Sequence, residues 1–279
     1  MLFSISSVYD LTTTPPTLMH RFKYDELCFI RAVALYDHFL FIATFDTMSI
    51  YDLTTLQHVI EYNLNEQEIP NFVNVVAFHP NLPLFAFGSQ NQTMFILTLT
   101  TTSLPIIKYT VQHSHTKYIT CVVFHCNVAL LATGSRDHST ILYDLTTEPP
   151  TPLCHLKHHT DWVSAVAFHP TLQLVATGSY DTTSIMYNTS TSPPTIQFHF
   201  RDHEYCILSV AFHSNCSLFA TSSMFKKIIL YNISTSPPTI QQCVEHKTYH
   251  VWCVTFHQRF PLLLTIGTKL TILYNLDKM

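Results

Sequence analysis

The stretch VVAFHP at residues 75–80 decides the fold of this 279-residue chain, because the chain repeats it at regular intervals. Its copies are CVVFHC at 121–126, AVAFHP at 165–170, SVAFHS at 209–214 and CVTFHQ at 253–258. The spacing settles at 44 residues, and a weaker copy, AVALYD, lies at 32–37. Six copies of one short unit predict a repeat architecture.

Each copy opens a series of four predicted β-strands. A second apolar run follows, as in LVATGS at 174–179, and a third ends in Tyr-Asp or Tyr-Asn, as in ILYD at 141–144. A loop rich in Thr, Ser and Pro then leads to an outer fourth run, because a proline pair cannot continue a hydrogen-bonded ladder. Four strands in about 44 residues is the size of a β-propeller blade. We therefore expect an all-β propeller of four-stranded antiparallel blades, with the apolar first strands near its axis.

The number of blades follows from counting strands along the chain. Residues 4–11 are expected to form a third strand and residues 18–24 an outer one, so the chain starts in the middle of a blade. The total is 25 strands, which favours one domain over residues 1–279 with six blades and a surplus strand at about 3–10. The expected closure combines the first two C-terminal strands with the N-terminal outer strand in one blade, and residues 4–11 and 271–276 compete for its third position. A ring of seven blades, or an incomplete ring, is the alternative, although it would expose apolar edges.

Four polar positions recur within the repeats. A His precedes the first strand, a Thr lies in the second, an Asp lies in the following turn, and a Tyr nearly ends the third strand. They are His115, Thr133, Asp137 and Tyr143 in one repeat, and His159, Thr177, Asp181 and Tyr187 in the next. This pattern resembles the WD-repeat (WD40-type) β-propeller family over nearly the whole chain, although Tyr replaces the Trp of the name-giving dipeptide. The resemblance implies that these residues form a structural network.

The composition excludes several classes of protein. Apolar residues make up 47% and charged residues 11%, and the net charge is −4, which argues for a globular fold without the basic surface that nucleic acids or anionic membranes require. We expect neither as a partner. The chain has no apolar run of about 18 residues and its first residues lack the pattern of a signal peptide, so a cytoplasmic or nuclear location is expected. Its eight cysteines form no CxxC pair and are expected to be buried free thiols.

Neither catalysis nor metal binding is expected. The histidines that follow Phe in five repeats would form a ring around the axis, too spread out for one zinc ion, and we expect them to cap turns or pack. The predicted axial strands contain no Asp, Glu, Lys or His, whereas an acid–base enzyme needs such groups to converge. The prediction is therefore a protein that is not an enzyme and has no cofactor and no metal.

A binding surface is the remaining prediction. In the family, partners usually dock where the loops before the first strands meet the turns after the second strands. Transferred to this chain, that face would present Tyr118, Arg136, Trp162, Tyr180, Tyr205, Met224 and Tyr249, which are residue types enriched at interfaces. The leading hypothesis is an interaction scaffold for a protein or peptide partner, acting as a monomer or as a subunit of a larger complex.

The alternative is a substrate receptor or adaptor subunit of a ubiquitin-ligase-type assembly. Some such WD-repeat receptors carry an Arg two residues after the dipeptide, but Thr146 and Ser190 occupy that position here. A pull-down would distinguish the two hypotheses.

Overall fold

The structure, a computed structural model, describes the strands of all the repeats and most of their connections. The described residues are 4–10, 17–24, 32–36, 39–44, 47–55, 57–63, 73–98, 106–112, 114–247, 250–257, 262–267 and 270–276. Within these ranges the structure contains 25 strands, the number counted from the sequence. No helix in this part of the chain has the length and apolar character needed to cross a membrane.

The strands form seven antiparallel sheets, five of which have four strands. The first contains β3 (Ala32–Tyr36), β4 (Phe39–Ala43), β5 (Thr47–Asp52) and β6 (Gln57–Asn63). The second contains β7 (Val73–Phe78), β8 (Leu84–Ser89), β9 (Met94–Thr98) and β10 (Ile106–Val111). The third contains β11 (Ile119–Phe124), β12 (Leu130–Ser135), β13 (Thr140–Asp144) and β14 (Thr151–Leu156). The fourth contains β15 (Val163–Phe168), β16 (Leu174–Ser179), β17 (Ser184–Asn188) and β18 (Thr195–Phe200). The fifth contains β19 (Ile207–Phe212), β20 (Leu218–Ser223), β21 (Lys227–Asn232) and β22 (Thr239–Glu245).

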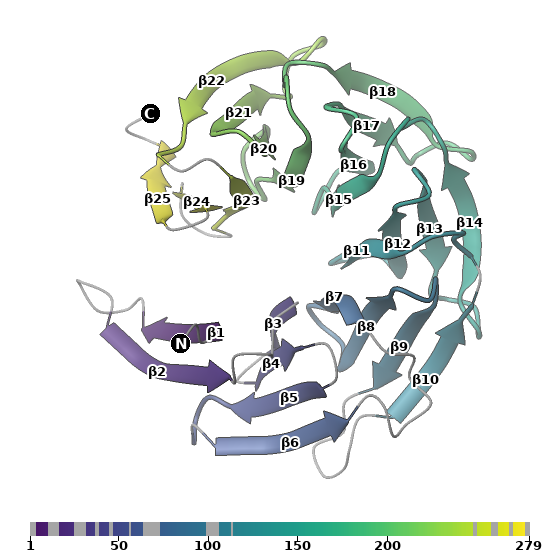
Figure 1. The fold of residues 1–279 in the computed structure, drawn as a ribbon. Coiled ribbons are helices and arrows are strands. Elements are labelled where there is room, and N and C mark those ends of the chain that lie inside the picture. Colours follow the sequence, from purple (N-terminus) through teal and green to yellow (C-terminus); the bar gives the residue numbers. More distant parts are fainter. Residues whose placement is uncertain are drawn as a thin grey trace.

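The sheets are blades arranged around a central axis (Figure 1). The first strand of each blade is innermost and the fourth is outermost, and β7, β11, β15, β19 and β23 (Val251–Phe256) follow one another around the axis. Each loop between a third and a fourth strand lies at the opposite end of the blade from the turn between its second and third strands. The all-β propeller with four-stranded blades, predicted from the spacing of the repeats, is confirmed.

The chain ends differ from the predicted closure. The strand β1 (Ser4–Asp10) pairs with β2 (Thr17–Tyr24), whereas β23, β24 (Leu262–Gly267) and β25 (Thr271–Asn275) form a separate sheet. The third position of the closing blade is taken by β25, one of the two expected candidates, but β2 pairs with β1 and not with this blade, so the expected joining of the chain ends was wrong. Each end strand pairs with its neighbour in sequence, because a short hairpin connection loses less entropy on closing than a contact between the two chain ends. Six blades stays a prediction, because the described strands form five complete blades and two incomplete sheets.

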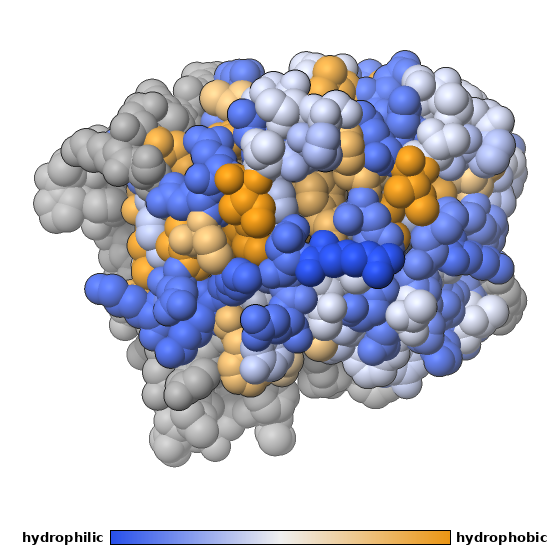
Figure 2. Space-filling view, turned by 90° about the horizontal axis from the view of Figure 1, so that it is seen from above, coloured by the Kyte–Doolittle hydropathy of each residue, from blue (hydrophilic) through white to orange (hydrophobic). Residues whose placement is uncertain are grey.

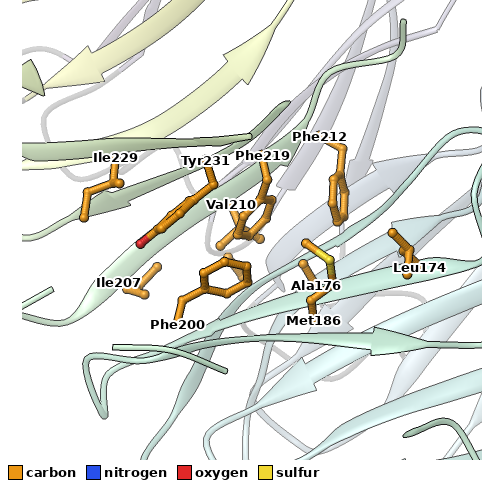
Figure 3. Close-up of a cluster of buried hydrophobic side chains, with 11 residues drawn as sticks. Leu174, Ala176, Met186, Phe200, Ile207, Val210, Phe212, Phe219, Ile229 and Tyr231 are labelled. Atoms are coloured by element: carbon orange, nitrogen blue, oxygen red, sulfur yellow. The ribbon is translucent and has the colours of Figure 1, made fainter. Parts of the chain in front are cut away.

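Neighbouring blades are joined by apolar packing. In Figure 3, Ala176 and Met186 of one blade face Val210 and Phe219 of the next, within one buried cluster. Gly178 lies at the closest approach, where an added Cβ would be 2.6 Å from Ile207 Cγ2 of the next blade. A glycine in the interior of a strand is typical of such a close approach.

The turns between the first and second strands are built on the histidines that follow Phe. The Nδ1 atom of His169 accepts hydrogen bonds from the backbone N–H groups of Thr171 and Leu172, at 3.2 and 3.0 Å. His79, His125 and His213 hold their turns in the same way. These histidines therefore cap turns, as predicted, and their Nδ1 lone pairs are occupied.

Figure 2 shows one side of the outer surface, and the coloured part of it is predominantly polar. The edge-on view in Figure 2 shows hydrophobic side chains as separate patches on a largely hydrophilic surface. Leu153, Ile196 and Ile240 are exposed on the outermost strands. The seven cysteines within the described residues are free, as expected, but Cys216 and Cys243 are exposed and were wrongly predicted to be buried, because they lie in a turn and on an outermost strand.

Candidate interaction face

The loops before the first strands and the turns between the second and third strands form one face of the propeller, which we call the loop face. In the third, fourth and fifth blades it comprises residues 114–118, 135–139, 158–162, 179–183, 202–206 and 223–227. Its shape depends on polar contacts that the sequence places at a constant spacing.

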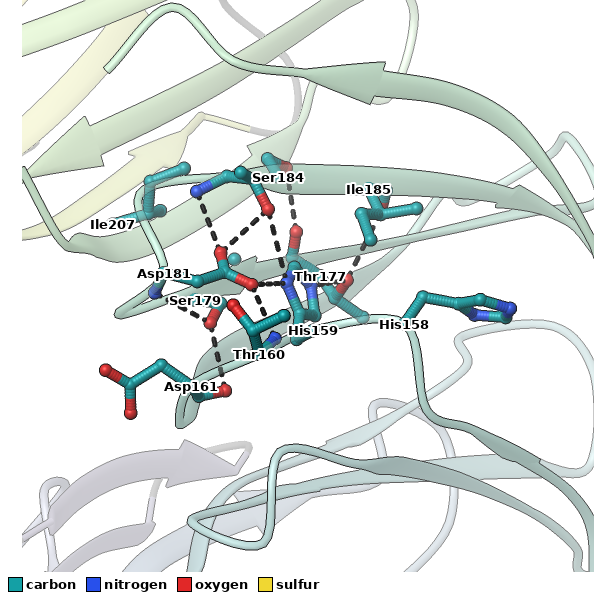
Figure 4. A network of polar contacts seen from close by, with 12 residues as sticks. His158, His159, Thr160, Asp161, Thr177, Ser179, Asp181, Ser184, Ile185 and Ile207 are labelled. Atoms are coloured by element: carbon teal, nitrogen blue, oxygen red, sulfur yellow. Dashed lines mark hydrogen bonds and ion pairs between the residues drawn. The ribbon is translucent and has the colours of Figure 1, made fainter. Parts of the chain in front are cut away.

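The network of the fourth blade is shown in Figure 4. His159 is buried, with Nδ1 2.8 Å from Asp181 Oδ2 and Nε2 2.7 Å from Thr177 Oγ1. The backbone N–H of Thr160 donates to Asp181 Oδ2, and the N–H and hydroxyl of Thr183 donate to Oδ1 at 2.9 and 2.7 Å. One carboxylate thus ties the loop before the first strand to the turn after the second.

The third blade repeats this arrangement. His115 Nδ1 lies 3.0 Å from Asp137 Oδ2, and Nε2 lies 2.7 Å from Thr133 Oγ1. Burial by itself would raise the pKa of the Asp137 carboxyl, but hydrogen bonds from His115, Ser139 and Thr116 and the charge of His115 hold that pKa well below its usual range. The same balance, with His159 as the main partner, holds the pKa of Asp181 well below its usual range. Both carboxylates are therefore ionised acceptors at neutral pH.

The tyrosines of the third strands extend the network. Tyr143 and Tyr187 are fully buried, and each hydroxyl reaches the residue before the histidine of its own repeat. The Tyr143 hydroxyl donates to Ser114 Oγ at 2.6 Å, and the Tyr187 hydroxyl lies 3.3 Å from His158 Nδ1. A tyrosine can thus anchor this loop where the family usually has a tryptophan.

Backbone hydrogen bonds place the predicted interface residues. The N–H of Arg136 donates to the carbonyl of Tyr118, and the N–H of Tyr180 donates to that of Trp162, both at 2.9 Å. In the next blade the equivalent bond joins Met224 to Cys206. Tyr205 is exposed on the same loop but lies one residue before the position equivalent to Trp162. Tyr249 lies outside the described residues.

Arg136 connects the third and fourth blades on the loop face. Its Cζ atom lies 4.2 Å from the centroid of the Trp162 ring and 5.0 Å from that of the Tyr118 ring. Trp162 also contacts Tyr180, with ring centroids 5.3 Å apart. Among the described residues none accepts a hydrogen bond from this guanidinium, so its N–H groups remain available to a partner while the aromatic rings fix its position.

A shallow depression of about 220 Å³ opens beside this cluster. Its lining includes Arg136, Trp162 and Tyr180, together with Leu208 and Trp252. Trp252 is 49% exposed and was not among the predicted interface residues. The repeat register could have identified it, because Thr120, Ser164, Leu208 and Trp252 are equivalent positions of successive first strands.

The axial side of the cluster is held by contacts from blade to blade. Asn74 Nδ2 donates to the carbonyl of Ile119 in the next blade at 3.3 Å. The hydroxyls of Thr120 and Ser164 likewise donate to the carbonyls of Val163 and Ile207. These bonds fix the relative positions of successive blades, so the cluster is a pre-formed surface. Within the described ranges, no three His, Cys, Asp or Glu residues gather as metal ligands would.

Comparison with known proteins identifies the repeat. The family model described as "WD domain, G-beta repeat" matches residues 107–144, 150–188 and 194–232. A chain in a solved structure described as "Crystal Structure of Mitotic Checkpoint Complex" superposes with a TM-score of 0.81 at 16% sequence identity, covering 97% of this chain and 80% of that chain. At this identity the likeness shows the fold. No curated protein matches the chain.

Proposed function

Because this chain is a WD-repeat β-propeller, we propose that it is a non-catalytic scaffold whose loop face binds a protein or peptide partner. Propellers of this family generally act as interaction scaffolds. The observation that carries the proposal is the cluster of Arg136, Trp162 and Tyr180, in which an Arg with available N–H groups is stacked on aromatic rings. Such residues supply much of the binding energy in known interfaces.

The cluster defines what a partner must present. The guanidinium edge of Arg136 can donate to a carboxylate or to backbone carbonyls, and the rings of Trp162 and Trp252 offer apolar contact beside it. A partner segment with an acceptor flanked by an apolar side chain fits this arrangement. Since the cluster is held by its own framework, binding orders few additional side chains.

The test begins with an affinity pull-down and mass spectrometry, which supply a partner. Its affinity is then measured for the wild type and for Trp162→Ala, where we expect a loss of about 2 kcal/mol or more. The matched control is Leu172→Ala, which removes an exposed apolar side chain from the opposite face of the same blade. Retention by Trp162→Ala together with loss by Leu172→Ala would contradict the proposed face. The ubiquitin-ligase alternative predicts ligase subunits among the captured proteins.

A further inference from the structure

The fifth blade departs from its two neighbours at one position of the turn. Phe225 stands where the third and fourth blades have Asp137 and Asp181. Its ring is 40% exposed and lies against Tyr205, with centroids 4.2 Å apart. The repeat therefore has no carboxylate at this position, while the histidine that would bind it is kept.

The histidine of this repeat is His203, which is equivalent to His115 and His159. It is only 5% exposed, and its Nε2 atom lies 2.6 Å from Thr221 Oγ1, as in the other blades. Its Nδ1 atom is buried and has no hydrogen-bond partner among the described residues. A buried polar atom without a partner is unfavourable and indicates a missing group, which in the third and fourth blades is a carboxylate.

Neighbouring residues line an open pocket of about 300 Å³ that includes Phe225. Glu204 contributes to the lining at the position of Thr160, whose backbone N–H binds the carboxylate at 2.9 Å. Lys227 contributes at the position of Thr183, whose hydroxyl binds the other carboxylate oxygen. The pocket thus adjoins the turn that lacks its carboxylate, although His203 is not part of the lining and the Lys227 ammonium already donates one hydrogen bond, to the carbonyl of Asp202 at 2.8 Å.

The turn of the fifth blade is also more positively charged than its equivalent in the fourth blade. Where the fourth blade has Tyr-Asp-Thr-Thr, residues 224–227 read Met-Phe-Lys-Lys, so one negative charge is replaced by two positive ones. The pocket also carries Glu204 and Glu245, whose side chains are exposed. These two carboxylates at the rim of the pocket repel a dianion such as phosphate more strongly than they repel a ligand with one carboxylate.

We propose that this pocket binds the side-chain carboxylate of an Asp or Glu from a protein partner, which takes the place of the missing turn Asp. One oxygen accepts the hydrogen of His203 Nδ1, and the Lys227 ammonium pairs with the carboxylate. Tyr205 and Phe225 pack on the neighbouring partner residues. The proposal rests on the loop face being a protein-binding surface, and it names a charge that the partner carries.

The direct test is NMR of protein labelled with ¹⁵N-histidine, titrated with N-acetylaspartate N-methylamide. We expect a saturable shift of the His203 ring nitrogens, with those of His115 and His159 unchanged, and no shift with the asparagine analogue. Inorganic phosphate and N-acetylalanine test other sources of the anion. A response to either of these without a response to the aspartate probe would overturn the proposal.

Phe225→Asp is the matched variant, because it supplies the carboxylate from within the chain. It should weaken the response of His203 to the probe at least tenfold, whereas Phe225→Asn should retain the response. An unchanged response in Phe225→Asp, or no response in the wild type, would overturn the proposal. A His203 signal in the free protein that changes in Glu245→Gln would also overturn it, since the chain's own carboxylate would then occupy the site.

This test is separate from that of the loop face as a whole. Trp162→Ala should bind the aspartate probe as the wild type does, even if it no longer retains a protein partner. Conversely, a partner whose affinity falls in Trp162→Ala but is unchanged in Phe225→Asp would support the scaffold function and would overturn the proposal of a carboxylate pocket.

Discussion

Asp181→Ala tests whether one carboxylate holds the loop face together. The substitution removes the acceptor of four hydrogen bonds, whose donors are His159, Thr160 and Thr183. Thr160 is exposed and can bind water instead, whereas His159 is buried. A buried donor left without an acceptor costs about 1–3 kcal/mol. Since Thr183 Oγ1 lies 3.3 Å from His159 Nδ1 and can accept part of that bond, we expect a loss near the middle, about 2 kcal/mol.

Urea unfolding at pH 7 measures this loss. With an m-value of about 3 kcal/mol per molar, the midpoint should fall by about 0.7 M. Asp137→Ala should behave alike, because its carboxylate has the same partners. Asp144→Ala is the control, since its carboxylate caps only the exposed Thr146, and it should shift the midpoint much less. Unchanged midpoints for Asp137→Ala and Asp181→Ala would show that the network does not stabilise the fold.

The same variant has a defined pH dependence. The folded-state pKa of Asp181 lies well below the value of about 3.9 for an unperturbed Asp. A depressed carboxyl pKa stabilises the fold above the unfolded pKa, and this contribution is lost as the pH falls towards the folded pKa. The difference between wild type and Asp181→Ala should therefore be full at pH 7 and should shrink below about pH 4. A difference that is constant down to pH 2 would contradict the assigned ion pair.

Three further changes test individual contacts. Burial, and to a lesser extent the positive charge of Lys227, lower the pKa of His203 to about 4. The stability that depends on a neutral His203 is therefore full above about pH 6.5, and about 2 kcal/mol of it is lost at pH 5. Urea unfolding at pH 7 and at pH 5 should show a smaller loss of stability for Phe225→Asp than for the wild type. Thr140→Val should stabilise the fold by about 1 kcal/mol in thermal unfolding, because Thr140 Oγ1 is buried without a partner among the described residues. Gly178→Ala should destabilise it by about 1–3 kcal/mol, since the added Cβ meets Ile207; an unchanged urea midpoint would show that the blades can separate there.

The repeat made most of the fold predictable. Alternating and apolar runs of fixed length identify strands, and a constant spacing between them identifies a blade, so the strand count needed no tertiary information. The contact between His159 and Asp181 was implied by the resemblance to the WD-repeat family, whose pattern also occurs in the preceding repeat. Local spacing decides these features, and local spacing is visible in a sequence.

Features that depend on competition between segments were less predictable. The sequence shows that the end segments form strands, but the partner of β2 is decided by the relative free energies of two pairings. Trp252 was missed because the prediction weighed loop residues and treated first strands as buried. The turn conformation was also hidden, since His138 and Thr182 have φ values of 71° and 72° where a glycine would have marked the left-handed region.

In the fifth blade, the stability of the fold is linked to the binding of a partner. By analogy with Asp181→Ala, the absence of a turn carboxylate should make this blade about 1–3 kcal/mol less stable than one that has it. In a repeat ring each blade mainly contacts its neighbours, so the deficit stays local and the rigid third and fourth blades keep their shape. A partner that inserts a carboxylate beside His203 restores the missing acceptor, and the free energy that the fold lacks becomes part of the binding free energy. The loop face thus combines a pre-formed aromatic cluster around Arg136 with an adjoining blade that gains stability when an acidic partner binds.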